Sequence, residues 1–119
     1  MSEIDISLEG EVAMYFQSLG ITHGPGDLQY RLIIRVLAEN EGYITMFSDI
    51  RAYTDQIADR GSVGSKLKVI FLMAGLAEKV QRGGYVITDK GLAAARFIEE
   101  STRFYKKAMQ IDGIIERIP

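Results

Sequence analysis

Apolar residues recur at helical spacing in the middle of this chain. Val63, Leu67 and Phe71 fall four residues apart, so at about 100° per residue they lie on one stripe of a helix. This pattern predicts an amphipathic helix over about residues 62–74, with Ser62 as its N-cap. The apolar stripe must be buried against the rest of the domain.

A β-hairpin is predicted directly after this helix. Gly75 offers a left-handed position at which the helix can end, and two short β-prone runs follow, at residues 77–80 and 85–88. Gly83 and Gly84 join these runs in a tight turn. Thr88 then has the residue type and position to cap the start of a further helix.

The first half of the chain adds two helices that precede any strand. The apolar spacing of residues 8–19 predicts a helix that Gly20 terminates, and its apolar face must pack on the domain or on a second subunit. A glycine-rich loop then leads to Asp27, the expected N-cap of a helix over residues 28–39. That helix is apolar on two sides, so we expect it to be central.

A short strand and another helix complete the middle of the chain. Residues 43–45 are β-prone, and residues 46–59 carry apolar side chains at helical spacing. The sequence therefore predicts a mainly α fold with a small β-hairpin, in the α+β class.

The last segment, about residues 90–118, is predicted to form one long helix or two that break near Gly113. A single helix would span about 40 Å at ~1.5 Å per residue, more than the side of so small a domain. We therefore expect its distal half to pack on a partner chain, and antiparallel pairing would make a two-fold homodimer. The expected interface comprises Phe97, Phe104, Tyr105, Ala108, Ile111, Ile115 and Ile118.

The order helix, short strand, helix, turn, helix, hairpin over residues 27–91 resembles a winged helix-turn-helix domain, as found in bacterial and archaeal regulators of the MarR and PadR type. The resemblance implies sequence-specific binding of double-stranded DNA in transcription regulation. A recognition helix over residues 62–74 would enter the major groove, and a wing over residues 77–88 would contact the DNA backbone. Residues 1–26 and 92–119 would then be an added N-terminal helix and a dimerisation element.

The distribution of charge favours this interpretation more than its sum does. The net charge is −2, but residues 1–20 carry acidic groups without a basic partner among them, whereas residues 60–82 hold five cations against Glu78 alone. Lysine and arginine near phosphates supply affinity, while side chains at base edges supply specificity. The candidate DNA-binding residues are Arg60, Ser62, Ser65, Lys66, Lys68, Lys79 and Arg82.

Composition excludes several other functions. The chain has no cysteine and one histidine, His23, so cysteine- or histidine-based metal sites and thiol chemistry are excluded. No arrangement of nucleophile, base and orienting group recurs, so we expect neither catalysis nor a cofactor. The acidic N-terminus does not resemble a signal peptide, and no apolar run is long enough to span a membrane, so we expect a cytoplasmic protein.

Two other functions stay open at this point. Val69 and Leu72 are apolar on the face that should meet DNA, and a winged helix that binds another protein would use such groups. A small-molecule effector could bind between the central and C-terminal helices, as MarR-like proteins often do, although no residue here identifies one.

Overall fold

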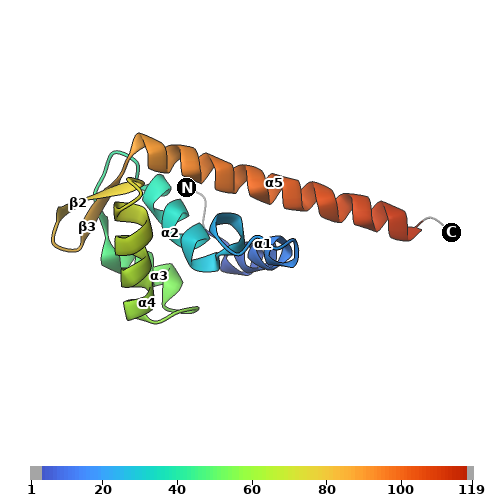
Figure 1. Ribbon diagram of the computed structural model, residues 1–119, viewed down its shortest axis with the longest axis horizontal. Helices are drawn as coiled ribbons and strands as arrows, with labels where there is room; N and C mark the ends of the chain where they lie inside the picture. Colours follow the sequence, from blue (N-terminus) through green and yellow to red (C-terminus); the bar gives the residue numbers. More distant parts are fainter. Residues whose placement is uncertain (1–3, 118–119) are drawn as a thin grey trace.

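The computed structural model describes residues 4–117, with side chains up to residue 111. Within these residues it holds five α-helices, one turn of 3₁₀ helix, a π-helical segment and three short strands (Figure 1). The elements are α1 Ile6–Ser18, η1 Gly24–Gly26, α2 Leu28–Glu39, β1 Thr45–Met46, α3 Phe47–Thr54, α4 Arg60–Lys66, η2 Leu67–Leu72, β2 Ala77–Gln81, β3 Gly84–Ile87 and α5 Asp89–Arg117. The predicted α+β class, mainly helical with a small sheet, is confirmed.

The three strands form one antiparallel sheet in the order β1-β3-β2. Thr45 of β1 pairs with Tyr85 of β3, and β2 lies along the other side of β3 as the predicted hairpin. Gly83 turns the hairpin with a φ of +70°, a conformation that glycine adopts without steric cost. The Phe47 N–H donates to the Gly83 carbonyl at 2.7 Å, which ties the hairpin turn to the start of α3.

Helix α2 lies at the centre of the core, as its two apolar faces predict. Leu32, Ile33 and Leu37 are fully buried, and α2 packs against α1, α3 and α5. Its bounds are those predicted, and Asp27 caps it, with Oδ1 accepting a hydrogen bond from the Tyr30 N–H at 3.2 Å.

Helix α4 continues into the π-helical segment η2, so residues 60–72 form one rod. Val63, Leu67 and Phe71 are at most 1% exposed, which confirms the predicted buried stripe. The chain turns away from this rod at Gly75, whose φ is +76°. The Leu76 N–H then donates to the Phe71 carbonyl at 2.8 Å and closes the end of the rod.

The N-terminal and C-terminal helices both pack on α2. Val12, Ala13 and Phe16 of α1 are buried, so α1 packs within its own chain. Helix α5 is continuous through Gly113 to Arg117, and its second half extends beyond the other elements (Figure 1). The molecule is accordingly elongated, with dimensions of 60 × 27 × 26 Å.

The start of α5 is bonded to the end of the α4–η2 rod. The Thr88 hydroxyl donates to the Gly75 carbonyl at 2.6 Å, and Lys90 Nζ donates to the Ala74 carbonyl at 2.6 Å. Thr88 Oγ1 also accepts a hydrogen bond from the Gly91 N–H at 3.0 Å, which confirms Thr88 as the predicted cap of α5.

Helix α3 is shorter than predicted. It ends at Thr54 and does not continue to residue 59. The Thr54 carbonyl accepts hydrogen bonds from the N–H groups of Ile57 and Ala58, both at 3.0 Å, in the turn that follows the helix. The apolar spacing that includes Ile57 is therefore compatible with this turn as well as with a helix.

The helix predicted over residues 62–74 ends earlier, at Leu72, and the starts of α4 and β1 also differ from the prediction. The N-cap of α4 is Asp59, whose Oδ1 accepts a hydrogen bond from the Ser62 N–H at 2.8 Å, so the prediction that Ser62 caps this helix is wrong. Strand β1 begins at Thr45, and Tyr43, predicted to be in it, is 76% exposed outside the sheet. Among residues 4–117, no helix has both the length and the apolar character needed to cross a membrane.

Candidate nucleic-acid interface

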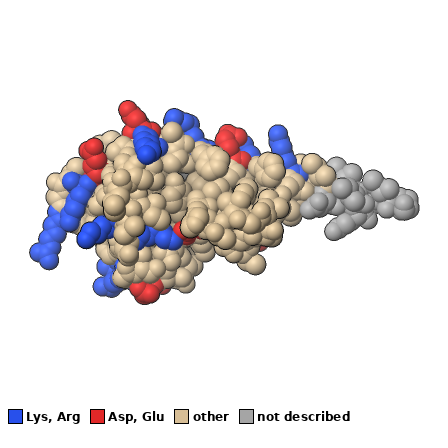
Figure 2. Space-filling model, in the orientation of Figure 1, with Lys and Arg blue, Asp and Glu red and all other residues tan. Residues whose placement is uncertain are grey.

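The structure brings the seven candidate DNA-binding residues to two neighbouring elements, the α4–η2 rod and the hairpin, which pack against each other through η2 and β2. We call the exposed surface of these elements the α4–hairpin face. Figure 2 shows Lys and Arg side chains at this end of the molecule. The rod carries Arg60, Ser62, Ser65, Lys66 and Lys68, β2 carries Lys79, and the hairpin turn carries Arg82.

Four cations on this face are exposed, and within the part of the chain that the structure describes none of them is in an ion pair. They are Arg60, Lys68, Lys79 and Arg82. Two exposed carboxylates, Asp59 and Glu78, lie on the same elements or next to them. The cations outnumber these carboxylates, so the face keeps a positive balance that attracts polyanions.

The charge of Lys66 is compensated. Its Nζ forms an ion pair with Asp27 Oδ2, and the two side chains are 21% and 14% exposed. Asp27 also caps α2, so this pair joins the start of α2 to α4. Lys66 therefore lies at the edge of the face, with its ammonium group directed to a carboxylate of its own chain.

The two serines of the rod differ in their surroundings. Ser62 Oγ lies 3.2 Å from Gln29 Nε2, so its hydroxyl is held against α2. Ser65 is exposed, as is Lys68 three residues further along the rod. Residues three apart on a helix are neighbours, so Ser65 and Lys68 present a polar pair to solvent.

Apolar groups interrupt the polar surface further along the rod. Val69 is 56% exposed and Met73 is 78% exposed, whereas Leu72, predicted to point outward, is half-buried against the core. A shallow hollow of about 300 Å³ lies beside Val69, lined also by Ser62, Ser65, Lys66 and Ile70. The face therefore combines exposed cations with a small apolar patch in the second half of the rod and just beyond its end.

An aromatic pair supports the rod from behind. The Tyr30 and Phe71 rings stack, with centroids 5.0 Å apart and an interplanar angle of 30°. Burial raises the pKa of the Tyr30 hydroxyl, and the nearby Asp27 carboxylate raises it further. This contact holds η2 against α2, the central helix of the core.

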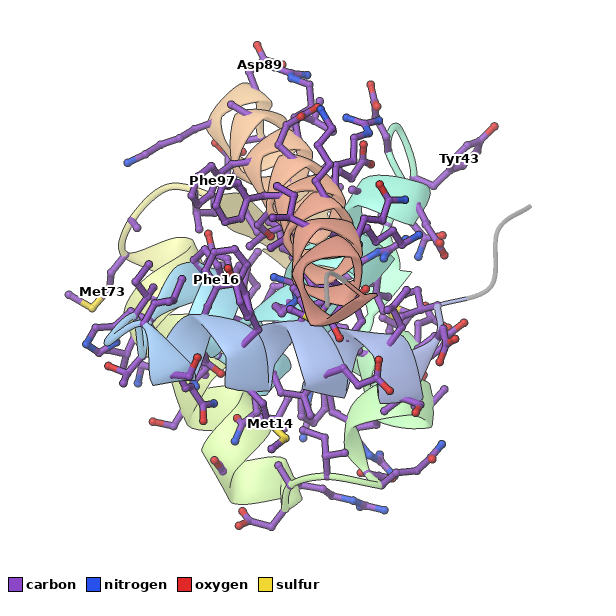
Figure 3. All side chains as sticks on the ribbon, turned by 90° about the vertical axis from the view of Figure 1, so that its right-hand side faces the viewer. Met14, Phe16, Tyr43, Met73, Asp89 and Phe97 are labelled. Atoms are coloured by element: carbon purple, nitrogen blue, oxygen red, sulfur yellow. The ribbon has the colours of Figure 1, made fainter. Side chains whose placement is uncertain are left out.

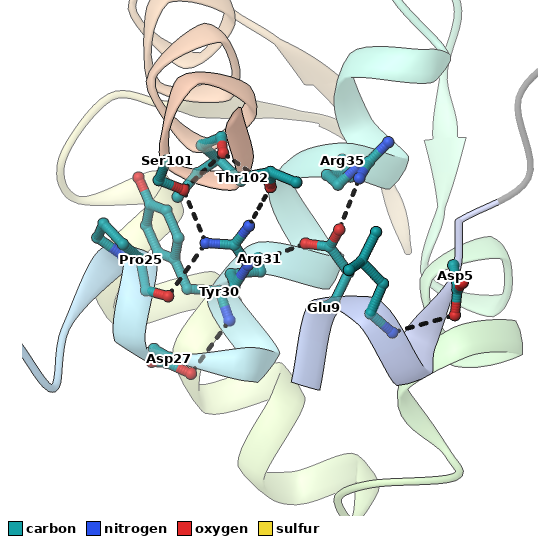
Figure 4. Close-up of polar contacts among 11 residues, drawn as sticks. Asp5, Glu9, Pro25, Asp27, Tyr30, Arg31, Arg35, Ser101 and Thr102 are labelled. Carbon is teal, nitrogen blue, oxygen red and sulfur yellow. Dashed lines mark hydrogen bonds and ion pairs between the residues drawn. The ribbon is translucent and has the colours of Figure 1, made fainter. Parts of the chain in front are cut away.

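A buried ionic network connects α1, α2 and α5 (Figure 4). Glu9 and Arg31 are both fully buried, with Arg31 Nε donating to Glu9 Oε1 at 2.9 Å. Arg35 Nη1 donates to Glu9 Oε2 at 2.6 Å. Three more Arg31 N–H groups bond to the Pro25 carbonyl at 3.1 Å, the Ser101 hydroxyl at 2.9 Å and the Thr102 hydroxyl at 2.6 Å.

The charge pattern of the sequence does not reveal this network. Glu9, one of the acidic groups of residues 1–20 that have no basic partner among them, has two basic partners in α2. Burial lowers the pKa of Arg31, and the Glu9 carboxylate opposes this shift. The signal for burial was present, because Glu9 precedes Ala13 and Phe16 at i, i+4 and i+7 on the buried side of α1.

The predicted dimer residues divide into exposed and half-buried groups. Phe97, Phe104 and Ile111 are 58%, 56% and 56% exposed. Tyr105 and Ala108 are half-buried, and the Tyr105 ring meets Tyr15 of α1 edge to face at 5.4 Å. The Ile115 side chain and all of Ile118 lie outside the described residues.

An apolar groove runs between the end of α1 and the exposed side of α5. Its volume is about 530 Å³, and Phe16, Leu19, Ile21, Phe97 and Phe104 supply most of its apolar lining. The charged side chains at its edge, Glu100, Arg103 and Lys107, all belong to α5. In the described part of the chain, His, Asp and Glu side chains form no group that could hold a metal ion.

Comparisons of the chain with protein-family models, curated proteins and solved structures gave no match. The class defined by the structure is therefore a small α+β domain with a cationic helix–hairpin face and a projecting C-terminal helix.

Proposed function

We propose that residues 27–91 form a winged helix-turn-helix domain that binds double-stranded DNA. The order α2, β1, α3, α4–η2, β2, β3 and the antiparallel sheet β1-β3-β2 support this assignment. In this proposal the α4–η2 rod is the recognition helix and the β2–β3 hairpin is the wing. The protein acts by docking, without catalysis, as a transcription regulator.

The observation that carries the proposal is the set of unpaired, exposed cations on the rod and the hairpin. Lys68 lies beside Ser65 on the outward side of the rod, where a major groove would bring base edges. Arg60, Lys79 and Arg82 flank them and would contact phosphates. Helix α5 packs on α2 and leaves this face open (Figure 1).

The proposal includes a homodimer. Three exposed apolar side chains on α5 leave a surface that a second copy would cover. Two recognition helices would then meet successive major grooves, about 34 Å apart, and the preferred site would be pseudo-palindromic.

Fluorescence anisotropy with labelled duplex DNA over a salt series tests DNA binding. We expect Arg82→Ala to weaken binding to every duplex similarly and to reduce the salt slope by about 0.9, since one phosphate contact is lost. Lys68→Ala should reduce the preference for a selected site over random duplex at least about fivefold, as a lost base contact costs about 1–3 kcal/mol.

Lys106→Ala is the matched control, because Lys106 is an exposed cation on α5, far along the chain from the face. It should leave affinity and salt slope unchanged. Equal binding by the wild type and a Lys68/Lys79/Arg82 triple alanine variant would disprove the proposal.

The exposed patch of Val69 and Met73 favours one alternative, a winged helix that binds a protein partner. In that case duplex binding would be absent or indifferent to the three cations, while Met73→Glu would abolish capture of the partner.

A further inference from the structure

Three exposed apolar side chains on α5 recur at intervals of seven residues. They are Phe97, Phe104 and Ile111, and each has more than half of its surface exposed. At ~1.5 Å per residue they lie about 10.5 Å apart along the helix axis. A seven-residue repeat turns by only about 20° per repeat on a straight helix, which is the geometry of a helix that pairs with another helix.

The surroundings of this row are shaped for a second helix. The groove of about 530 Å³ is bounded by α5 on one side and by Leu19 and Ile21, at the end of α1, on the other. Leu19 is 54% exposed and Ile21 is 41% exposed. Figure 3 shows Phe97 and Phe16 on the same side of α5, with Met14 on the opposite side of α1, directed away from α5.

Acidic and basic side chains beside this row fall in separate turns of α5. Arg96 precedes Phe97, Glu99 and Glu100 come next, and Arg103 and Lys107 follow one to two turns later. Glu100 and Arg103 form an exposed ion pair within the chain. In a parallel pair of these helices, the acidic turns of both copies would lie at one level and the basic turns at another. In an antiparallel pair, the acidic turn of each copy lies level with the basic turn of the other, which is favourable.

We propose that the groove is occupied by α5 of a second copy, running antiparallel, with the two-fold axis beside Phe104. Phe97 of each copy then lies opposite Ile111 of the other, and Glu100 lies about one residue, or ~1.5 Å, from the level of Lys107. This arrangement rests on the homodimer of the proposed function and gives it an orientation, a register and a contribution from the end of α1.

Cysteine cross-linking tests the register, because the chain has no native cysteine. Phe97→Cys and Ile111→Cys are made separately and oxidised alone or as a mixture. In the antiparallel register, two copies of position 97 are about 21 Å apart along the axis, far beyond the Cα separation of about 7 Å that a disulfide permits. The mixture should therefore give at least tenfold more disulfide-linked dimer than either variant alone.

Glu100→Cys and Lys107→Cys repeat the test at exposed positions that do not support the core, so the test does not depend on replacing apolar side chains. Each variant alone should again give little dimer, and the mixture should give much. Strong cross-linking of every single variant would show a parallel pair, and a monomeric mass by light scattering at micromolar concentration would show no pair. Either result overturns the proposal.

The role of α1 has its own matched pair of variants. Leu19→Glu should reduce cross-linking of the 97/111 mixture at least tenfold, whereas Met14→Glu, on the far side of the same helix, should not. No DNA is present in these experiments. Their failure would therefore leave DNA binding untouched, and a protein that dimerises as described but does not bind duplex would remove only the proposed function.

Discussion

Replacing Glu9 with alanine should destabilise the fold more than any change of an exposed carboxylate. Glu9 is fully buried and is the only carboxylate of the described residues that pairs with Arg31, itself fully buried. Removing one partner of a buried ion pair typically costs about 3–5 kcal/mol, because the other charge stays buried without compensation.

The surroundings of Arg31 and Arg35 place the expected cost of Glu9→Ala within this range of about 3–5 kcal/mol. Arg31 would keep hydrogen bonds to the Pro25 carbonyl and to the hydroxyls of Ser101 and Thr102. Arg35 is 24% exposed and can be solvated when its partner is removed. We therefore expect the lower end, about 3 kcal/mol, with most of the loss arising at Arg31.

Urea denaturation followed by circular dichroism measures this loss as a change in the unfolding free energy. Glu41→Ala removes an exposed carboxylate after α2 and serves as the control, with an expected change within about 0.5 kcal/mol. A double variant, Glu9→Leu with Arg31→Met, should recover much of the loss, since apolar replacement of both partners removes the unpaired charge. A loss below about 1 kcal/mol for Glu9→Ala would refute the reasoning.

Three further predictions concern the face, the rod and alkaline pH. Asp27→Asn keeps a capping side chain but releases Lys66, so duplex affinity should rise several-fold in anisotropy titrations and the salt slope should steepen. Gly75→Ala should cost about 1 kcal/mol in urea denaturation because its φ is +76°, whereas Gly10→Ala, inside α1, should stabilise by about 0.5–1 kcal/mol. Because the pKa of Tyr30 is raised in the folded state, its contribution to stability is fully present below about pH 10 and is lost as the pH rises through the folded pKa. Tyr30→Phe should therefore flatten the alkaline decline in melting temperature.

The helices could be predicted because their apolar residues follow one period. Helix α2 was predicted with its observed bounds, since Asp27 marks its start and apolar groups on two sides require a central position. The start of the α4–η2 rod was misplaced by two residues because Gly61 is a poor helix former, although Asp59, three residues before Ser62, is a good capping residue. The helix preference of Gly61 and the local cap at Asp59 disagreed at this point, and the cap determined the boundary.

The candidate site was less accessible to sequence reasoning. The exposure of Lys68 and Arg82 followed from the helical period and the hairpin turn, but the pairing of Lys66 with Asp27 joins residues 39 positions apart. Periodicity carries no information about such contacts. The same holds for Arg31, whose partners Glu9 and Ser101 are 22 and 70 positions away.

The hydrogen bonds between the start of α5 and the end of the α4–η2 rod couple the orientation of the long helix to that of the rod. Thr88 and Lys90 fasten its base to the carbonyls of Gly75 and Ala74, so the helix and the rod turn together. A helix of 29 residues is about 43 Å long, and a tilt of about 10° at its base displaces the far tip by roughly 7 Å. A partner that binds the far end of α5 therefore controls the orientation of the rod and of the hairpin packed on it, and a large displacement at the tip corresponds to a small rotation at the base.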